Sequence, residues 1–249
     1  MKTILEVCVD SYASAMAAVA GGANRLELCS CLLVGGLTPD VALLEQIREK
    51  TDIPIRCLMR PRFGDFLYDE SEIQQMETQI RRLAAAGADG FVIGCLTPAG
   101  ELDLGRMARL IAAAGGRGVT LHRAFDVCRD GLTAARQAVE LGVDTILTSG
   151  QAADCWTGRA YLSRLLAENL PVTVMAGGGV SGEVIRRLLA LPLYAFHMSG
   201  KTTVNSGMTF RREGVPMGLP GLDEFTIWQT DGAKVRAAAT VLREAGRWS

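Results

Sequence analysis

The feature that most constrains this fold is a regular alternation of short apolar runs with longer segments rich in alanine and leucine. Eight runs have the composition of buried strands, and they cover residues 4–9, 25–29, 53–59, 90–95, 119–124, 143–148, 172–176 and 194–198. The segments between them, such as 72–86 and 132–141, carry apolar residues at helical spacing. Glycine recurs at three helix-to-strand joints, Gly22, Gly87 and Gly142, where it tolerates the left-handed backbone that ends a helix. Strands that alternate with helices indicate a parallel sheet.

Eight strand–helix units in 249 residues predict a single domain over residues 1–249, folded as a closed (β/α)8 barrel of the α/β class, a TIM barrel. A doubly wound open sheet is the alternative, but such sheets usually have fewer strands, and no GxGxxG motif follows the first run. The exception to the pattern is an irregular arm at about 201–230, rich in glycine and proline, before a final helix over 231–247. Loops of this length are often functional or form interfaces.

Composition and charge exclude several classes of protein. Lys+Arg is 26 and Asp+Glu is 27, so the net charge is −1, which argues against a nucleic-acid-binding protein. No apolar run approaches the ~18 residues of a membrane span, and Glu6 and Asp10 interrupt the stretch where a secretory signal would lie. Seven scattered cysteines then predict free thiols in a reducing compartment instead of a disulfide framework. We expect a cytoplasmic protein that binds neither nucleic acid nor membrane.

Polar residues alternate with apolar ones inside several of the predicted strands. In a barrel, alternate side chains face the interior, and active sites lie at the C-terminal ends of the strands. In the first two runs, the leucine and valine side chains are expected to pack against the helices. The residues that alternate with them then face inward, and these are Glu6, Cys8, Arg25, Glu27 and Cys29. Further candidates in later runs are Arg56, Leu58 and Arg60 in the third, His122 with Asp126 beyond it in the fifth, and His197 and Ser199 in the eighth. Both histidines of the chain are therefore candidates for the interior.

The convergence of these residues favours a functional pocket. A single buried charge is most often half of a structural ion pair, and a single buried histidine is most often part of the core. Several together are costly, because an unpaired buried charge destabilises a fold by several kcal/mol. Glu27 suits a base, His122 an acid, and Arg60 a partner for an anionic substrate group; Asp126 and His197 complete the candidate catalytic set. These residue types are suited to proton transfer, but they do not identify a particular reaction.

Two glycine-rich strand ends form a candidate anion site. The seventh run leads into three consecutive glycines, and the eighth leads into Ser199-Gly200-Lys201. In many barrels the loops after strands seven and eight bind phosphate through backbone N–H groups. The predicted anion-binding residues are Gly178, Gly179, Ser199, Gly200 and Lys201. The alternative is that the glycines only permit tight turns.

The thiols form a third candidate group. Cys29 and Cys31 make a C-x-C pair just past the second run, near Cys8 if the first two strands are neighbours. Thiolates are soft ligands that suit Cu(I), whereas a closed zinc site is disfavoured because the chain has no pair of C-x2-C motifs. The remaining thiols at 57, 95 and 128 have the character of small buried apolar residues.

Seven motifs in order along the chain resemble the signature of the CutC family. They are RLELC at 25–29, GGLTP at 35–39, MRPRFGDFLY at 59–68, LHRAFD at 121–126, LTSGQ at 147–151, MAGGGV at 175–180 and HMSG at 197–200. The resemblance covers essentially the whole chain and implies a (β/α)8 barrel. It also implies a cytoplasmic protein of copper homeostasis that assembles as a homodimer or larger homo-oligomer, with the 201–230 arm at the interface or over the barrel mouth.

The resemblance also implies copper binding, because cysteines of the family are proposed to bind Cu(I). Cys29 in the RLELC motif would carry that role, with Cys8 and Cys31 as co-ligands. Copper(I) is the cofactor that the family implies, and the residues by themselves require none. Two functions stay open: a copper-binding homeostasis protein, and a barrel enzyme acting on a small anionic metabolite, phosphorylated ones included. An interaction protein is a third option, against which the converging charged residues argue. The fold does not decide among these options.

Overall fold

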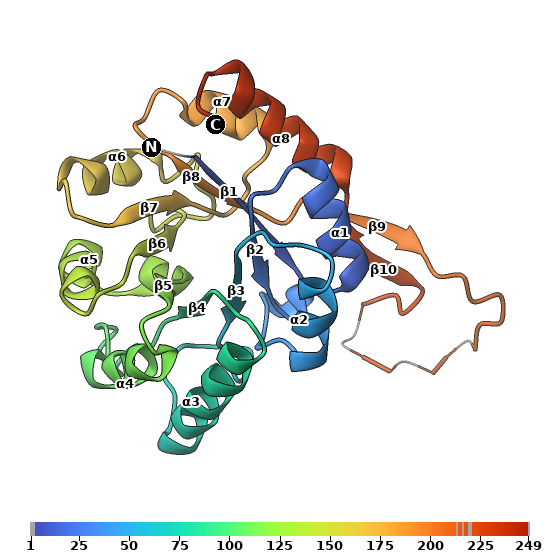
Figure 1. The fold of residues 1–249 in the computed structure, drawn as a ribbon, viewed down its shortest axis with the longest axis horizontal. Helices are drawn as coiled ribbons and strands as arrows, with labels where there is room; N and C mark the ends of the chain where they lie inside the picture. Colours follow the sequence, from blue (N-terminus) through green and yellow to red (C-terminus); the bar gives the residue numbers. More distant parts are fainter. Residues whose placement is uncertain (1–2, 213, 216, 219–220, 249) are drawn as a thin grey trace.

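Eight parallel strands close into a barrel in the order β1 to β8, with the helices outside it (Figure 1), as the alternation predicts. The computed structural model describes residues 3–212, 214–215, 217–218 and 221–248. The barrel strands are β1 (Ile4–Val9), β2 (Arg25–Leu28), β3 (Ile55–Leu58), β4 (Gly90–Ile93), β5 (Gly118–Leu121), β6 (Thr145–Thr148), β7 (Thr173–Ala176) and β8 (Ala195–Met198). The TIM-barrel prediction is confirmed.

The outer layer consists of helices. They are α1 (Tyr12–Gly21), α2 (Val41–Arg48), α3 (Glu70–Ala85), α4 (Leu104–Ala114), α5 (Gly131–Glu140), α6 (Arg159–Ala167), α7 (Gly182–Leu188) and α8 (Gly232–Glu244), with short 3-10 turns η1 (Leu32–Val34) and η2 (Arg123–Val127). Helix α3 begins with a capping box, in which Asp69 accepts from the Glu72 N–H and Glu72 accepts in return from the Asp69 N–H. At the end of α1, Gly22 adopts φ 100°, as expected of a glycine in this position. No helix among the described residues is long and apolar enough to cross a membrane.

The fifth strand is shorter than the sequence predicts. The expected strand over 119–124 ends at Leu121, and His122 instead caps the η2 turn, where its Nδ1 accepts a hydrogen bond from the Ala124 N–H at 3.1 Å. This side-chain bond and the backbone bond from the Phe125 N–H to the His122 carbonyl at 3.0 Å form the turn that ends the strand. The LHRAFD motif therefore lies mostly in a loop at the carboxyl end of the barrel.

The predicted alternation of side chains is confirmed in β1, β2 and β3. Leu5, Val7 and Val9 belong to the large core between strands and helices, whereas Cys8, Cys29, Leu58 and Val92 form a separate cluster inside the barrel. The strand register pairs Glu6 with both Arg25 and His197, and it pairs Cys8 with Glu27. Register alone therefore brings residues from opposite ends of the chain together inside the barrel.

A partly buried ion pair lies near the amino ends of the strands. Arg56 points inward as predicted, and its guanidinium contacts Thr120 at 2.6 Å and Asp144 at 2.7 and 3.0 Å. These partners satisfy the charge of the Arg56 guanidinium. Arg56 therefore has a structural role at this end of the barrel.

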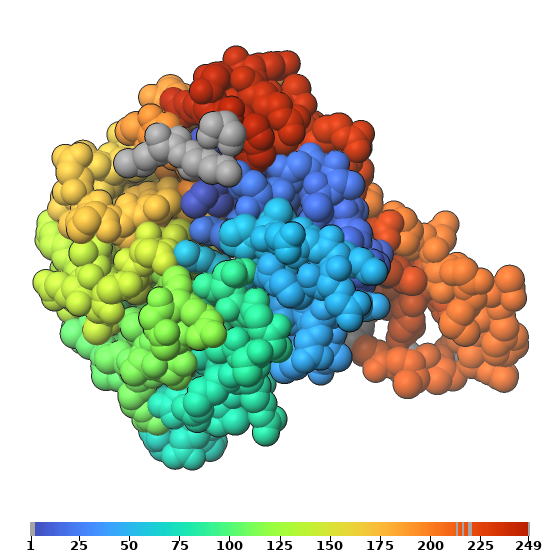
Figure 2. All heavy atoms as spheres, in the orientation of Figure 1, coloured from blue at the N-terminus to red at the C-terminus, as the bar shows by residue number. Residues whose placement is uncertain are grey.

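The arm at 201–230 is more regular at its base than the sequence predicts. Strands β9 (Lys201–Asn205) and β10 (Thr226–Thr230) pair antiparallel as a two-stranded sheet. The base of β10 is fixed to α1, since the Thr230 N–H donates to the Ser14 hydroxyl at 3.0 Å. From this base the arm projects away from the body of the barrel (Figures 1 and 2).

Candidate functional site

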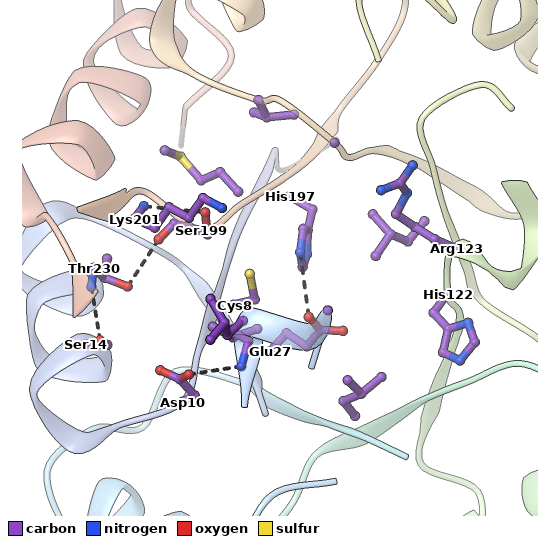
Figure 3. A pocket seen from close by; sticks show the side chains of 18 of the residues that line it. Cys8, Asp10, Ser14, Glu27, His122, Arg123, His197, Ser199, Lys201 and Thr230 are labelled. Carbon is purple, nitrogen blue, oxygen red and sulfur yellow. Dashed lines mark hydrogen bonds and ion pairs between the residues drawn. The ribbon is translucent and has the colours of Figure 1, made fainter. Parts of the chain in front are cut away.

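A cavity of about 410 Å³ opens at the carboxyl ends of the barrel strands. Residues from β1, β2, β3 and β8 form its floor, the loops after β5 and β7 form one wall, and the base of the β9–β10 hairpin forms another. Its charged and hydrogen-bonding side chains include Cys8, Asp10, Glu27, Arg60, His122, Arg123, His197, Ser199 and Lys201. Figure 3 shows Cys8, Glu27 and His197 close together at the centre of this cavity.

A buried ion network lies beneath the cavity. Glu6 is fully buried and binds the Arg25 Nε at 2.5 Å and the His197 Nδ1 at 2.8 Å. Burial by itself raises the pKa of Glu6, but the Arg25 guanidinium and His197 outweigh it and lower the pKa to about 2. Glu6 is therefore a permanent carboxylate that fixes the orientation of both cationic partners.

Glu27 and His197 are the titratable pair on the cavity floor. The His197 Nε2 lies 3.6 Å from the Glu27 carboxylate. Burial, together with the nearby Glu6 carboxylate, raises the pKa of Glu27 to about 6 against the attraction of His197. Burial lowers the pKa of His197, but Cys8, Glu27 and Glu6 outweigh burial and raise it well above its ordinary value. His197 therefore keeps its proton at neutral pH, and Glu27 is the member of the pair that titrates close to neutral pH.

The thiols separate into different environments. Ligand atoms of Cys8, Glu27 and His197 lie within 4.8 Å of one another, the one such three-residue group of potential metal ligands in the described part of the chain. Cys29 lies just behind it, fully buried, with its Sγ 3.6 Å from the Glu27 carboxylate; burial and that carboxylate raise the pKa of the Cys29 thiol well above its usual range. Cys31 is exposed and adopts φ 50°. The sequence predicts that Cys8, Cys29 and Cys31 form one metal site. In the structure, His197 and not Cys31 lies next to Cys8.

His122 and Arg60 line the cavity in roles that differ from those predicted. Burial, with the Arg60 charge nearby, lowers the pKa of His122 to about 3, so the imidazole is neutral and is not a protonated acid. The Arg60 guanidinium donates to the carbonyls of Val34, Gly36 and Gly64 at 2.7 to 3.2 Å. Arg60 therefore fastens the loops after β2 and β3 around the cavity.

Asp126 supports the cavity wall from behind. Its carboxylate accepts hydrogen bonds from the Thr148 hydroxyl and from the N–H groups of Ser149 and Gln151. It also binds the Arg123 Nε at 2.7 Å. With its oxygens occupied in this way, Asp126 positions the β6 loop and Arg123.

The predicted anion-binding residues divide between two places. Gly178 and Gly179 line the cavity, with positive φ of 84° and 73°; Gly178 lies beside Arg123 and Gly179 beside Asp154. Ser199 and Lys201 lie on the other side of His197 (Figure 3), where the Lys201 ammonium stands 4.9 Å from the Trp228 ring centre. Gly200 faces helix α8 and lines a neighbouring groove. The two glycine-rich ends therefore do not meet around one anion.

Arg123 and Asp10 are cavity residues that the sequence reading missed. Arg123 follows His122 in the LHRAFD motif, but a strand continued to residue 124 would turn its side chain toward the helices. The turn after Leu121 brings it to the cavity instead. Asp10 directly follows β1, and its carboxylate accepts from the Leu32 N–H at 3.1 Å. The aspartate directly after a barrel strand was a signal that could have identified Asp10.

Comparison with known proteins assigns this barrel to a family. The model of the CutC family matches residues 3–202. A CutC family protein of Parabacteroides distasonis is 43% identical over 241 residues, 95% of this chain and 99% of the relative. One of Histophilus somni is 40% identical over 242 residues, 96% and 99% of the two chains. A Streptococcus agalactiae crystal structure, provisionally named copper homeostasis protein CutC, superposes with a TM-score of 0.75 at 27% identity over 79% of this chain and 98% of that one. The family model covers all eight barrel strands, and the chain belongs to the CutC family.

Proposed function

We propose that this protein takes part in copper homeostasis by binding Cu(I) on the floor of the barrel cavity. The observation that carries the proposal is the group formed by Cys8, Glu27 and His197, whose ligand atoms lie within 4.8 Å of one another. The role in copper homeostasis is suggested by the name of the Streptococcus agalactiae relative.

The donor atoms suit a soft monovalent ion. A thiolate and an imidazole are ligands that Cu(I) accepts readily. The His197 Nδ1 is bonded to Glu6 at 2.8 Å, which leaves Nε2 as the ligand atom toward the cavity. A carboxylate on the far nitrogen of a ligating histidine orients the ring and raises its basicity. Cys8 and His197 would bind the ion, Glu27 would balance its charge, and Cys29 is the second thiol behind them.

Metal binding at this group would compete with protons. The pKa of His197 lies well above its ordinary value because of Cys8, Glu27 and Glu6, against the opposing effect of burial. Cu(I) must therefore displace the proton on Nε2, and its apparent affinity should fall as the pH is lowered.

An anaerobic Cu(I) titration against a competing chelator tests the proposal. We expect the Cys8→Ser and His197→Gln variants to bind Cu(I) more than tenfold more weakly than the wild type. Cys31→Ser removes an exposed thiol and serves as the matched control, with unchanged affinity. Cys29→Ser separates a direct ligand from a neighbour. Wild-type affinity in Cys8→Ser, or a loss confined to Cys31→Ser, would move the copper away from the barrel floor.

A second candidate function, an enzyme acting on a small anionic metabolite, is favoured by the size of the cavity. A volume of about 410 Å³ falls in the range of small-molecule sites and far exceeds the space that one ion needs. Glu27, His122, Arg123 and His197 supply polar contacts along its walls. Native mass spectrometry of the purified protein tests this function, since a bound organic anion supports it and a mass equal to protein plus metal alone contradicts it.

We also propose a cytoplasmic location. Of the seven cysteines, six are buried, and all seven are free thiols, which is the usual state in a reducing compartment. Fractionation of cells that produce the protein tests this location, and recovery outside the cytoplasmic fraction would contradict it.

A further inference from the structure

Arg123 is held so that one of its nitrogens is left for a ligand. Its Nε binds Asp126 at 2.7 Å, and its Nη2 donates to the Ser149 hydroxyl at 3.0 Å. Among the described residues, Nη1 has no hydrogen-bond partner, and the Arg123 side chain is 44% exposed on the cavity wall. Two anchors on one guanidinium fix the direction of the remaining donor, so little side-chain entropy is lost when an anion binds there.

Gly178 lies against this guanidinium, and the next residue, Gly179, lies against the Asp154 side chain. A Cβ on Gly178 would stand 3.6 Å from the Arg123 Cζ and 3.7 Å from Nη1, so the absence of a side chain keeps the guanidinium open to the cavity. Gly178 and Gly179 both have positive φ, and their N–H groups donate to no group in the described part of the chain. Successive N–H groups in such a turn form a concave site for anions.

The acidic groups near Arg123 also bear on anion binding at this position. Asp126 offsets part of the Arg123 charge, but its own oxygens accept from Thr148, Ser149 and Gln151, and Asp126 does not line the cavity. The anionic groups that line the cavity, Glu27 and Asp10, lie across it on the β1 and β2 side (Figure 3). Arg123 therefore lies on the cavity wall away from these two carboxylates.

We propose that the Arg123 Nη1 and the N–H groups of Gly178 and Gly179 bind a tetrahedral oxyanion, such as the phosphate group of a small organic ligand. The organic part then extends over His197 toward Glu27. This subsite is independent of copper, and it specifies the ligand class of the second candidate function, on which its biological role rests. Lys201 does not belong to it, because it lies on the opposite side of His197.

Titration calorimetry with inorganic phosphate at constant ionic strength tests the subsite. We expect saturable binding to the wild type, and binding at least about tenfold weaker (about 1.4 kcal/mol) in Arg123→Gln. Arg136→Gln is the matched control, because it removes the same charge from an exposed arginine whose ion-pair partner in the described structure is Glu168, and it should bind as the wild type does. Arg123→Lys keeps the charge without the two anchors; we expect weakened binding, and it replaces Arg123→Gln if that variant does not fold. Sulfate should compete with phosphate, and acetate should compete more weakly.

Two results would overturn the subsite. One is the absence of saturable phosphate binding to the wild type, and the other is equal affinity in the wild type and both Arg123 variants. If an organic molecule still co-purifies with the protein in either case, the cavity binds a metabolite through other groups. The subsite then fails while the second candidate function stands.

Discussion

Replacing Glu27 by glutamine should stabilise the protein at neutral pH. Glu27 is 5% exposed, and burial raises its pKa from 4.5 to about 6. At about 1.36 kcal/mol for each pKa unit, this difference corresponds to about 2 kcal/mol of destabilisation once the group is ionised. Because the pKa of the folded state is the higher one, the favourable contribution of the neutral carboxyl is fully present below about pH 4.5. It is lost as the pH rises through about 6.

The glutamine variant stays neutral and keeps the shape of the side chain. We therefore expect its free energy of unfolding at pH 7.5 to exceed that of the wild type by about 1–2 kcal/mol, an increase in Tm of roughly 2–8 °C for a chain of this size. At pH 4.5 the difference should nearly disappear. Differential scanning calorimetry at both values measures it. Such a gain, together with lost ligand binding, would mark Glu27 as a residue kept for function at the expense of stability.

Glu45→Gln is the matched control, since Glu45 is exposed in the middle of α2 and forms no ion pair among the described residues. It should change Tm little at either pH. A Glu27→Gln variant that is less stable than the wild type at pH 7.5 would refute the reasoning, as would a gain of equal size at pH 4.5. The first result would mean that His197 compensates the Glu27 charge, and the second that the gain does not come from the ionisation of Glu27.

Three further predictions follow from the fold. Glu6→Gln should lower the free energy of unfolding at pH 7 by about 3–5 kcal/mol in urea denaturation, because it leaves buried Arg25 without its carboxylate. Since the pKa of Glu6 in the folded state is lowered to about 2, this contribution is present in the wild type above about pH 4.5 and is lost as the pH falls toward 2. The same loss of stability with falling pH in the variant as in the wild type would contradict this prediction. Gly94→Ala should destabilise by about 1–3 kcal/mol, because its Cβ would stand within contact distance of the His122 ring, whereas Gly105→Ala in α4 should not destabilise. Replacing residues 206–225 by a two-residue Asn-Gly turn should reduce the mass of the expected homo-oligomer in light scattering, since the arm exposes large apolar side chains such as Phe210; an unchanged mass would remove the arm from the interface.

The sequence determined the barrel and much of its interior. Apolar alternation in the first three strands correctly turned Glu6, Cys8 and Glu27 inward, because a side chain of a strand has only two faces to choose from. The glycines after the helices marked the repeating unit, because few other residues adopt positive φ there. These are local properties, and a single sequence carries them.

Only the tertiary structure decided how the inward residues are paired. Whether Cys8 meets Cys31 or His197 depends on the closure of β8 against β1, across about 190 positions of sequence, and on the turn that exposes Cys31. The cavity role of Arg123 depends on the end of β5 at Leu121, after which His122 caps a turn by accepting from the Ala124 N–H. Local pattern fixes which face a side chain takes, but register and barrel closure fix its neighbours, and neighbours set the charge state and chemistry of a buried group.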